Sequence, residues 1–201
     1  MAVMGGLWFA EPASAQSHVL GWGLNGDLQA APVPTAVMSG VSSIAAGYNH
    51  SLALKDGAVS AWGNSTFGQT TNVPVAAQSG VIQIAGGSSF SLALKTNGAV
   101  VAWGAGLIAT NVPTELSSGV SQVAAGEWHA LALKDGGVVA WGSNTFGEST
   151  VPGHLTSGVT AISGGGFYSM ALKDGGVHVF GMPATNELEF GIQTEPAAAT
   201  S

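Results

Sequence analysis

Cysteine and arginine are both absent from the 201 residues. Without cysteine the chain has no disulfides, no thiol chemistry and no thiolate metal sites. Charged residues make up only 7% of the chain, four lysines are its only permanent cations, and the net charge is -7. A chain so poor in cations cannot neutralise several phosphates at once. Nucleic acid and anionic membrane surfaces are therefore excluded as expected partners, and no stretch is long enough to span a membrane.

Motifs that carry catalysis are also lacking. The sequence has no Asp-x-Asp-x-Asp-Gly calcium loop, no phosphate-binding Gly-Lys-Ser/Thr and no Gly-x-Ser-x-Gly elbow. The carboxylates of Asp27, Glu127 and Glu148 are scattered, and no pair has a spacing that suggests general acid–base chemistry. We therefore expect a protein that is not an enzyme and that has no catalytic residues, no cofactor and no metal site.

The two ends of the chain depart from the rest. Residues 1–10 are mostly apolar, and Ala13-Ser14-Ala15 has the small-x-small form of a signal-peptidase site before Gln16. We interpret residues 1–15 as a signal-peptide-like leader whose basic beginning is missing, with a disordered start as the alternative. A low charge fraction with many short polar side chains is typical of an exported protein, so we expect a secreted or cell-surface location. Residues 182–201 form an acidic tail that we expect to be disordered or a linker.

Between these ends the chain repeats one pattern four times: Gly-Val, a short run of small and β-branched residues, Leu-Ala-Leu-Lys or a close variant, a turn, and Val-x-x-Trp-Gly. Successive copies are 38 to 41 residues apart, which is typical of repeat architectures whose units stack on one another. The landmarks are Gly40, Gly80, Gly119 and Gly158, then Lys55, Lys95, Lys134 and Lys173, then Trp22, Trp62, Trp103 and Trp141, with Phe180-Gly181 as an altered fifth Trp-Gly.

One copy predicts several short antiparallel strands. Residues 41–46, 51–55 and 58–62 have strand composition, and Asp56-Gly57 supplies the tight hairpin turn. Residues 70–74 indicate a fourth, outer strand, where Pro74 suits a sheet edge. We interpret the repeated lysine as a solvated strand end. The prediction is an all-β propeller of mostly four-stranded blades of about 40 residues.

These motifs resemble the repeat of the regulator of chromosome condensation family, a seven-bladed propeller, over residues 18–181. The sequence of residues 70–81 is more similar to that of one branch of the family, the propeller-type β-lactamase inhibitory proteins. This resemblance implies a secreted, non-enzymatic module that binds another protein through its loops. It also implies a lone Trp-Gly strand at the start of the chain.

The sequence contains fewer repeat units than the seven blades that close the ring in this family. Within residues 16–181 we assign blades to residues 40–79, 80–118, 119–157 and 158–181, with an extra N-terminal strand at 18–23. Four blades predict an incomplete or open propeller. A truncated gene, a smaller ring and half of an assembly remain as alternatives.

The segments between the first and second strands vary most and are rich in aromatic residues. If they share one rim, they form a surface suited to protein binding. The alternative is that some rings, Phe90 above all, fill gaps between blades. The protein-binding candidates are Tyr48, Asn49, Phe90, Glu127, Trp128, Phe167 and Tyr168.

Other residues of the repeat are assigned to the scaffold. His50 and His129 share one position, whose counterparts we take to be Phe90 and Ser169, and we expect them to make structural hydrogen bonds within a blade. We expect Trp22, Trp62, Trp103 and Trp141 to be structural as well. The loops after Trp-Gly form a second candidate surface, in which Phe67 and Phe146 are expected to pack rather than to recognise a ligand. Its members are Asn25, Asp27, Asn64, Phe67, Asn144 and Phe146.

Two hypotheses about function follow. The first is an exported propeller that binds a protein partner of unknown identity, with enzyme inhibition as one form of that binding. The second is a structural or adhesive extracellular fragment without a discrete site. Self-assembly through unpaired blade edges is a further expectation. Nucleotide exchange and chromatin binding are disfavoured by the absence of arginine and by the negative net charge.

Overall fold

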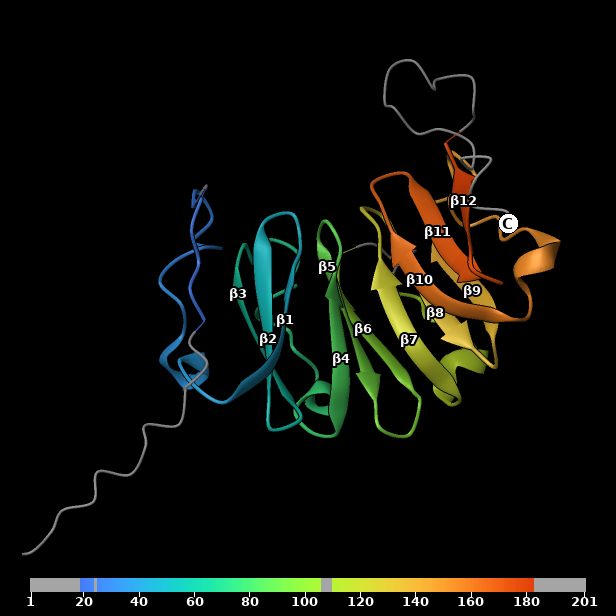
Figure 1. Cartoon of the computed structure of the whole chain (residues 1–201). Coiled ribbons are helices and arrows are strands. Elements are labelled where there is room, and N and C mark those ends of the chain that lie inside the picture. Colours follow the sequence, from blue (N-terminus) through green and yellow to red (C-terminus); the bar gives the residue numbers. More distant parts are fainter. Residues whose placement is uncertain (1–18, 24, 106–109, 183–201) are drawn as a thin grey trace, which may run out of the picture.

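The computed structural model describes residues 19–23, 25–105 and 110–182, and it contains four antiparallel sheets of three strands each. The sheets lie side by side in sequence order, from the sheet of β1, β2 and β3 at one end of the row to the sheet of β10, β11 and β12 at the other (Figure 1). This arrangement confirms the predicted all-β propeller-like fold with four blades. Blade 1 comprises β1 (Val41–Ala46), β2 (His50–Lys55) and β3 (Ala58–Gly63); blade 2, β4 (Val81–Gly86), β5 (Phe90–Lys95) and β6 (Val100–Gly104); blade 3, β7 (Val120–Ala125), β8 (His129–Lys134) and β9 (Gly137–Gly142); blade 4, β10 (Val159–Gly164), β11 (Tyr168–Lys173) and β12 (Gly176–Gly181).

Tight turns join the second and third strands of each blade. In blade 1, Asp56 and Gly57 have φ values of 51° and 74°, the pair of positive angles that a type I′ hairpin turn requires. Asp135 and Asp174 repeat this conformation in blades 3 and 4. Blade 2 uses a longer turn, in which Gly98 N donates to Lys95 O at 2.9 Å. The predicted turn chemistry is confirmed.

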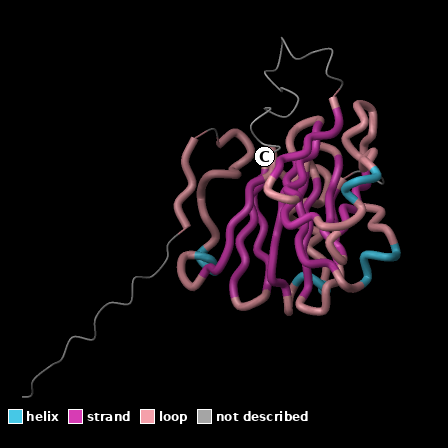
Figure 2. The backbone as a smooth tube through the Cα atoms, turned by 45° about the vertical axis from the view of Figure 1, so that its right-hand side comes forward, coloured by secondary structure: helices cyan, strands magenta, loops and turns pink. Residues whose placement is uncertain are grey.

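The fourth strand expected at residues 70–74 is not formed. Asn72 N donates to Gly68 O at 3.0 Å, and Thr70 Oγ1 donates to Asn64 O at 3.1 Å, so the segment satisfies its polar groups locally. Pro74 then precedes a short 3-10 helix rather than ending a strand. Such helices precede the inner strand of every blade (Figure 2): η1 (Thr35–Val37), η2 (Val75–Ala77), η3 (Thr114–Ser117) and η4 (Gly153–Leu155).

The repeated lysines bind these helices. Lys134 Nζ donates to Glu115 O and to Ser118 O, both at 2.7 Å, and Lys173 Nζ donates to His154 O at 2.6 Å. The Nζ atoms of Lys55 and Lys95 make equivalent bonds to carbonyls at η1 and η2. The last carbonyls of a short helix have no partner within the helix, so an ammonium group there is stabilising. These lysines stand at exposed strand ends, as expected, and their ammonium groups also bind carbonyls of the preceding 3-10 helix.

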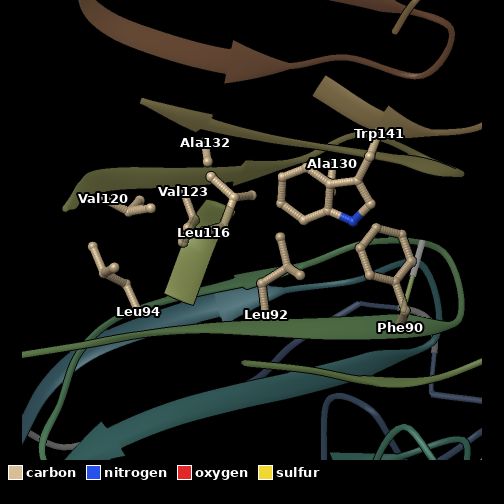
Figure 3. Packing of buried hydrophobic residues seen from close by; sticks show 9 residues of the cluster. All are labelled: Phe90, Leu92, Leu94, Leu116, Val120, Val123, Ala130, Ala132 and Trp141. Atoms are coloured by element: carbon tan, nitrogen blue, oxygen red, sulfur yellow. The ribbon is translucent and has the colours of Figure 1, made fainter. Parts of the chain in front are cut away.

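The hydrophobic core is divided among the three junctions between blades. At the junction of blades 2 and 3, Leu92 and Leu94 of β5 face Val120 and Val123 of β7 (Figure 3). Leu116 of η3 fills the same cluster and is fully buried. Separate clusters of similar apolar residues join blades 1 and 2 and blades 3 and 4. Each blade is therefore held by its neighbours, as in other repeat proteins.

The two ends of the row differ from the expected ring closure. Phe180-Gly181 lies in β12, which pairs with β11, so blade 4 has its own third strand. Residues 19–23, at which an extra strand was expected, run along blade 1 without strand structure, and residue 18 lies outside the described residues. The described residues form an open row of blades (Figure 1). None of their helices is long and apolar enough to cross a membrane.

Candidate functional site

The loops between the first and second strands of the four blades lie together along one edge of the row. Tyr48 N donates to Gly87 O at 3.1 Å, Ser88 N donates to Glu127 O at 2.9 Å, and Glu127 N donates to Gly166 O at 3.3 Å. Each bond joins one loop to the loop of the next blade. We call this edge the rim, formed by residues 47–49, 87–89, 126–128 and 165–167.

Aromatic side chains are exposed along the rim. The Tyr48 side chain is 74% exposed and Trp128 is 41% exposed. Phe167 is half-buried, and its ring meets that of Phe146 edge to face, with 5.1 Å between centroids. Asn49 and Glu127, half-buried beside them, add polar groups. The rim thus combines large apolar surface with hydrogen-bonding groups, as protein-binding surfaces do.

Phe90 does not belong to this surface. Its side chain is fully buried in the junction between blades 2 and 3, beside Leu92 and Trp141 (Figure 3). The neighbouring strand carries Ala130, which is small enough to admit the ring. The assignment of Phe90 to protein binding is corrected: it packs between blades.

Tyr168 occupies a different position from the one that the sequence suggested. It pairs with Gly181, as His50 pairs with Gly63, Phe90 with Gly104 and His129 with Gly142. Tyr168, and not Ser169, is thus the counterpart of the two histidines. An ideal Cβ at Gly165 would lie 2.4 Å from the Tyr168 ring, as one at Gly47 would lie 2.1 Å from the His50 ring. Tyr168 therefore faces the position of a following blade, not the rim.

The two histidines bind across junctions. His50 Nε2 lies 2.9 Å from Ser91 Oγ of blade 2, and His129 Nε2 lies 2.9 Å from Ser169 Oγ of blade 4. Ser169 Oγ donates to Glu148 O at 2.7 Å, so the hydroxyl accepts the proton of His129 Nε2. Burial lowers the pKa of His50 to about 4. Burial also lowers the pKa of His129, although the Glu148 charge works in the opposite direction. The histidines are structural, but between blades rather than within one.

The tryptophans of the repeat do not share one environment. Trp103 and Trp141 are buried, and Trp103 Nε1 donates to Gln69 O at 2.9 Å. Trp62 is half-buried, and its Nε1 is buried with no hydrogen-bond partner among the described residues. Trp22 is 86% exposed, which contradicts a scaffold role, because no neighbouring strand covers residues 19–23 in the described part of the chain.

Comparison with known proteins agrees with these blades. The pattern of the regulator of chromosome condensation (RCC1) repeat matches residues 41–69, 81–106 and 120–148, which begin at the inner strands of blades 1 to 3. The chain is thus similar to the RCC1 repeat over these three segments. No curated protein matches the sequence.

Solved structures share the fold of this chain. The ectodomain of the receptor kinase CR4 from Physcomitrella patens is 25% identical, with a TM-score of 0.62 over 81% of this chain and 46% of its own. The CRINKLY WD40 ectodomain of the Arabidopsis thaliana receptor kinase ACR4 is 22% identical, with a TM-score of 0.59 over 72% and 52%. Prp20p from Saccharomyces cerevisiae, described with its binding to Gsp1p and histones, is 20% identical, with a TM-score of 0.60 over 76% and 48%. The chain spans about half the length of the structures it matches.

The loops after Trp-Gly are built around one buried side chain that the sequence did not single out as structural. Glu148 is buried, and its carboxylate accepts hydrogen bonds from Ser143 Oγ at 2.6 Å and from Phe146 N at 2.7 Å. Burial raises the pKa of Glu148, but these hydrogen bonds outweigh it and the net pKa is lowered. Gln69 accepts from Phe67 N in the same way. The signal was the constant spacing of seven residues after the Trp of Trp-Gly.

The second candidate surface is mainly a set of turns. Asn25 Oδ1 accepts from Ala30 N and Ala31 N, and Asn144 Oδ1 accepts from Ser149 N, each at 2.9 Å. Asn64 Nδ2 donates to Asp27 at 3.0 Å, so these polar groups stabilise loops. Phe67 and Phe146 remain exposed at 54% and 38%, and Phe146 packs on Phe167 of the rim.

Histidine and acidic side chains do not gather into a metal site within the described ranges, where no group of three or more could hold an ion. His154 and His178 meet at the surface, with 3.2 Å between Nε2 and Nδ1 and 4.9 Å between ring centroids. His154 lies in η4, before the first strand of blade 4, and His178 lies in β12 of that blade, so neither residue is part of the rim loops.

Proposed function

We propose that this chain is an exported, non-enzymatic RCC1-type propeller module that binds another protein through its rim. The observation that supports this proposal most is the exposure of Tyr48 and Trp128 on loops that are held in place by backbone hydrogen bonds between blades. Burying an aromatic side chain at an interface gains much free energy and loses little side-chain entropy. A fixed backbone lowers the entropic cost of binding further.

The rim fits a protein better than a nucleic acid. Glu127 contributes a negative charge, while the four lysines are engaged with carbonyls at the opposite edge of the blades. Aromatic and amide side chains with few charges are typical of the centre of a protein interface. The binding of Gsp1p and histones described for Prp20p shows that a propeller of this fold can hold protein partners. Inhibition of an enzyme such as a β-lactamase is the more specific form of the proposal.

The test compares capture of partners by the rim with capture by a variant rim. The Tyr48→Ala/Trp128→Ala protein and the unchanged protein are immobilised and exposed to medium from the same culture, and bound proteins are identified by mass spectrometry. Loss of two interface anchors lowers the affinity for a true partner at least tenfold. Val75→Ala is the matched control, because Val75 is 88% exposed but lies in η2 at the opposite edge.

Equal capture by the unchanged and the variant rim would contradict the proposal. The inhibitory form is tested separately by following β-lactam hydrolysis by purified β-lactamases with and without the chain, and uninhibited hydrolysis would reject it. The second candidate function is a structural or adhesive array, supported by the open ends of the row. Further repeats in the flanking genomic sequence, together with an inert rim, would favour that array.

A further inference from the structure

The three junctions between blades share one set of contacts. One blade contributes two leucines from its second strand, or Phe and two leucines in blade 2, and the next blade contributes Val and Ile or Val from its inner strand. In each junction this next blade also contributes an Ala of its second strand and an aromatic residue of its third strand. Every blade thus has an outgoing face, directed at the next blade, and an incoming face, directed at the previous one.

None of the described residues covers the outgoing face of blade 4 as the next blade covers the others. Leu172 is 37% exposed, whereas its counterparts Leu54, Leu94 and Leu133 are at most 6% exposed. Val177 is 40% exposed, whereas its counterpart Val59 is 4% exposed. Tyr168 and Met170, half-buried on the same strand as Leu172, continue this apolar surface.

Within the described ranges, no blade covers the incoming face of blade 1 either. Ile44 is 66% exposed, whereas its counterparts Ile84, Val123 and Ile162 are at most 6% exposed. Leu20 and Trp22 lie beside it and line a cavity of about 370 Å³ together with Ile44 and Trp62. The face therefore offers both apolar surface and space to a partner.

The two uncovered faces have the composition of the two sides of a covered junction. Leucine and valine on the outgoing face correspond to the residues that pack on Ile84 in the junction of blades 1 and 2. Met170 takes the place of a leucine, and no residue named on either face carries a charge. A second copy of this chain thus offers each end face a surface like the one on which the internal faces pack.

One polar pair would set the register. Where a blade carries His at the start of its second strand, the next blade carries Ser, and Phe90 is followed by Ala130. Tyr168 on the outgoing face has a polar ring, and blade 1 offers Ser51 at the matching position. Ser51 Oγ donates to Gln29 O at 2.8 Å, as Ser169 Oγ donates to Glu148 O, so the Ser51 oxygen keeps its capacity to accept.

We propose that the chain associates with itself head to tail, with the outgoing face of blade 4 of one copy packed on the incoming face of blade 1 of the next. The contact uses different surfaces on the two copies, so it is heterologous and closes into a ring or continues as a chain of copies. Covering Leu172, Val177, Ile44 and Trp22 removes apolar surface from water, which drives the association. This inference is independent of the rim.

The decisive experiment is sedimentation velocity over a hundredfold range of concentration with three charged variants. The unchanged chain exceeds its monomer mass of 19.9 kDa as concentration rises. Ile44→Glu blocks one face and Leu172→Glu blocks the other, so each variant alone is a monomer. Mixed in equal amounts, the two variants form a complex of two copies and no larger species, because each retains the face that the other has lost. Val75→Glu, at the opposite edge, associates like the unchanged chain.

Both blocked positions are exposed, and circular dichroism verifies that the variants stay folded. The proposal is overturned if the unchanged chain remains at its monomer mass at every concentration. It is equally overturned if either variant still associates alone, or if the mixture yields no complex.

Discussion

His50 Nε2 lies 2.9 Å from Ser91 Oγ, across the junction between blades 1 and 2. The same pair recurs between His129 and Ser169 across the junction of blades 3 and 4. Between blades 2 and 3 both members change together, to Phe90 and Ala130. A buried imidazole needs a polar partner, and a buried ring of carbons needs none, so the two positions form one unit.

Exchanging one member of this unit should be costly, and exchanging both should be tolerated. Phe90→His places an unpaired polar ring in the core and should lower the free energy of unfolding by about 2–3 kcal/mol. Adding Ala130→Ser supplies the hydroxyl and should recover most of that loss. Urea unfolding of the two single variants and the double variant measures the coupling, expected at about 1–2 kcal/mol. Additive effects would contradict the idea of a paired unit.

The buried histidines make stability depend on pH. Burial lowers the pKa of His50 to about 4, so the folded chain keeps it neutral while the unfolded chain binds a proton below about pH 6.5. The unfolded state thus binds more protons in this range, and stability falls as pH drops from about 6.5 to 4, then levels off for this group. His50 accounts for a loss of about 3 kcal/mol, and His129 acts in the same direction.

Denaturant unfolding at half-unit steps from pH 7.5 to 4 measures this slope. The double variant His50→Phe/Ser91→Ala copies the pair found between blades 2 and 3, and it should show a shallower fall because one buried histidine is gone. An equally steep fall in that variant would show that His50 titrates freely in the folded chain. Glu148, with its lowered pKa, adds a loss of stability only below its ordinary pKa of 4.5.

The sequence predicted the strands and the open row well, because the repeat aligns four copies of each short segment. It could not separate Phe90 from the exposed aromatic residues. Position in the repeat places Phe90 near the rim, but its burial depends on Ala130, which lies 40 residues away in the next blade. The predicted repeat position of Tyr168 was wrong by one residue, because the start of the second strand cannot be recognised after Gly164-Gly165-Gly166. Counting back from Lys173 gives the correct register.

The predicted fourth strand failed for a local reason. Residues 70–74 have the composition of a strand, but Thr70 and Asn72 donate hydrogen bonds to the preceding loop and not to a neighbouring strand. Side-chain groups that bind nearby backbone compete with strand formation in this way. The rim itself could be placed from the sequence, since all four loops follow the inner strands, but the exposure of each side chain could not.

The repeated lysine should contribute to stability through its bonds to carbonyls. Lys134→Met keeps most of the aliphatic stem and removes the two hydrogen bonds to Glu115 O and Ser118 O. We expect a loss of about 1–2 kcal/mol in the free energy of unfolding, because hydrogen bonds from a charged donor are stronger than those between neutral groups. Lys134→Arg keeps donors and should lose less. If Lys134→Met unfolds at the same urea concentration as the unchanged chain, the lysine is only a solvated strand end.

The glycine that follows each inner strand should be intolerant of a side chain, because an aromatic ring lies against it. An ideal Cβ at Gly87 would lie 2.0 Å from Cε1 of Phe90, and the fully buried Phe90 ring has no space into which to move. Gly87→Ala should therefore cost at least about 2 kcal/mol of overpacking. Gly153→Ala is the matched control, since a Cβ there would meet nothing within 4 Å, and it should leave stability unchanged or raise it slightly. Thermal unfolding of both variants measures the difference. Equal midpoints would mean that the Phe90 ring can move out of the junction at no cost, so that its packing does not help to join blades 2 and 3.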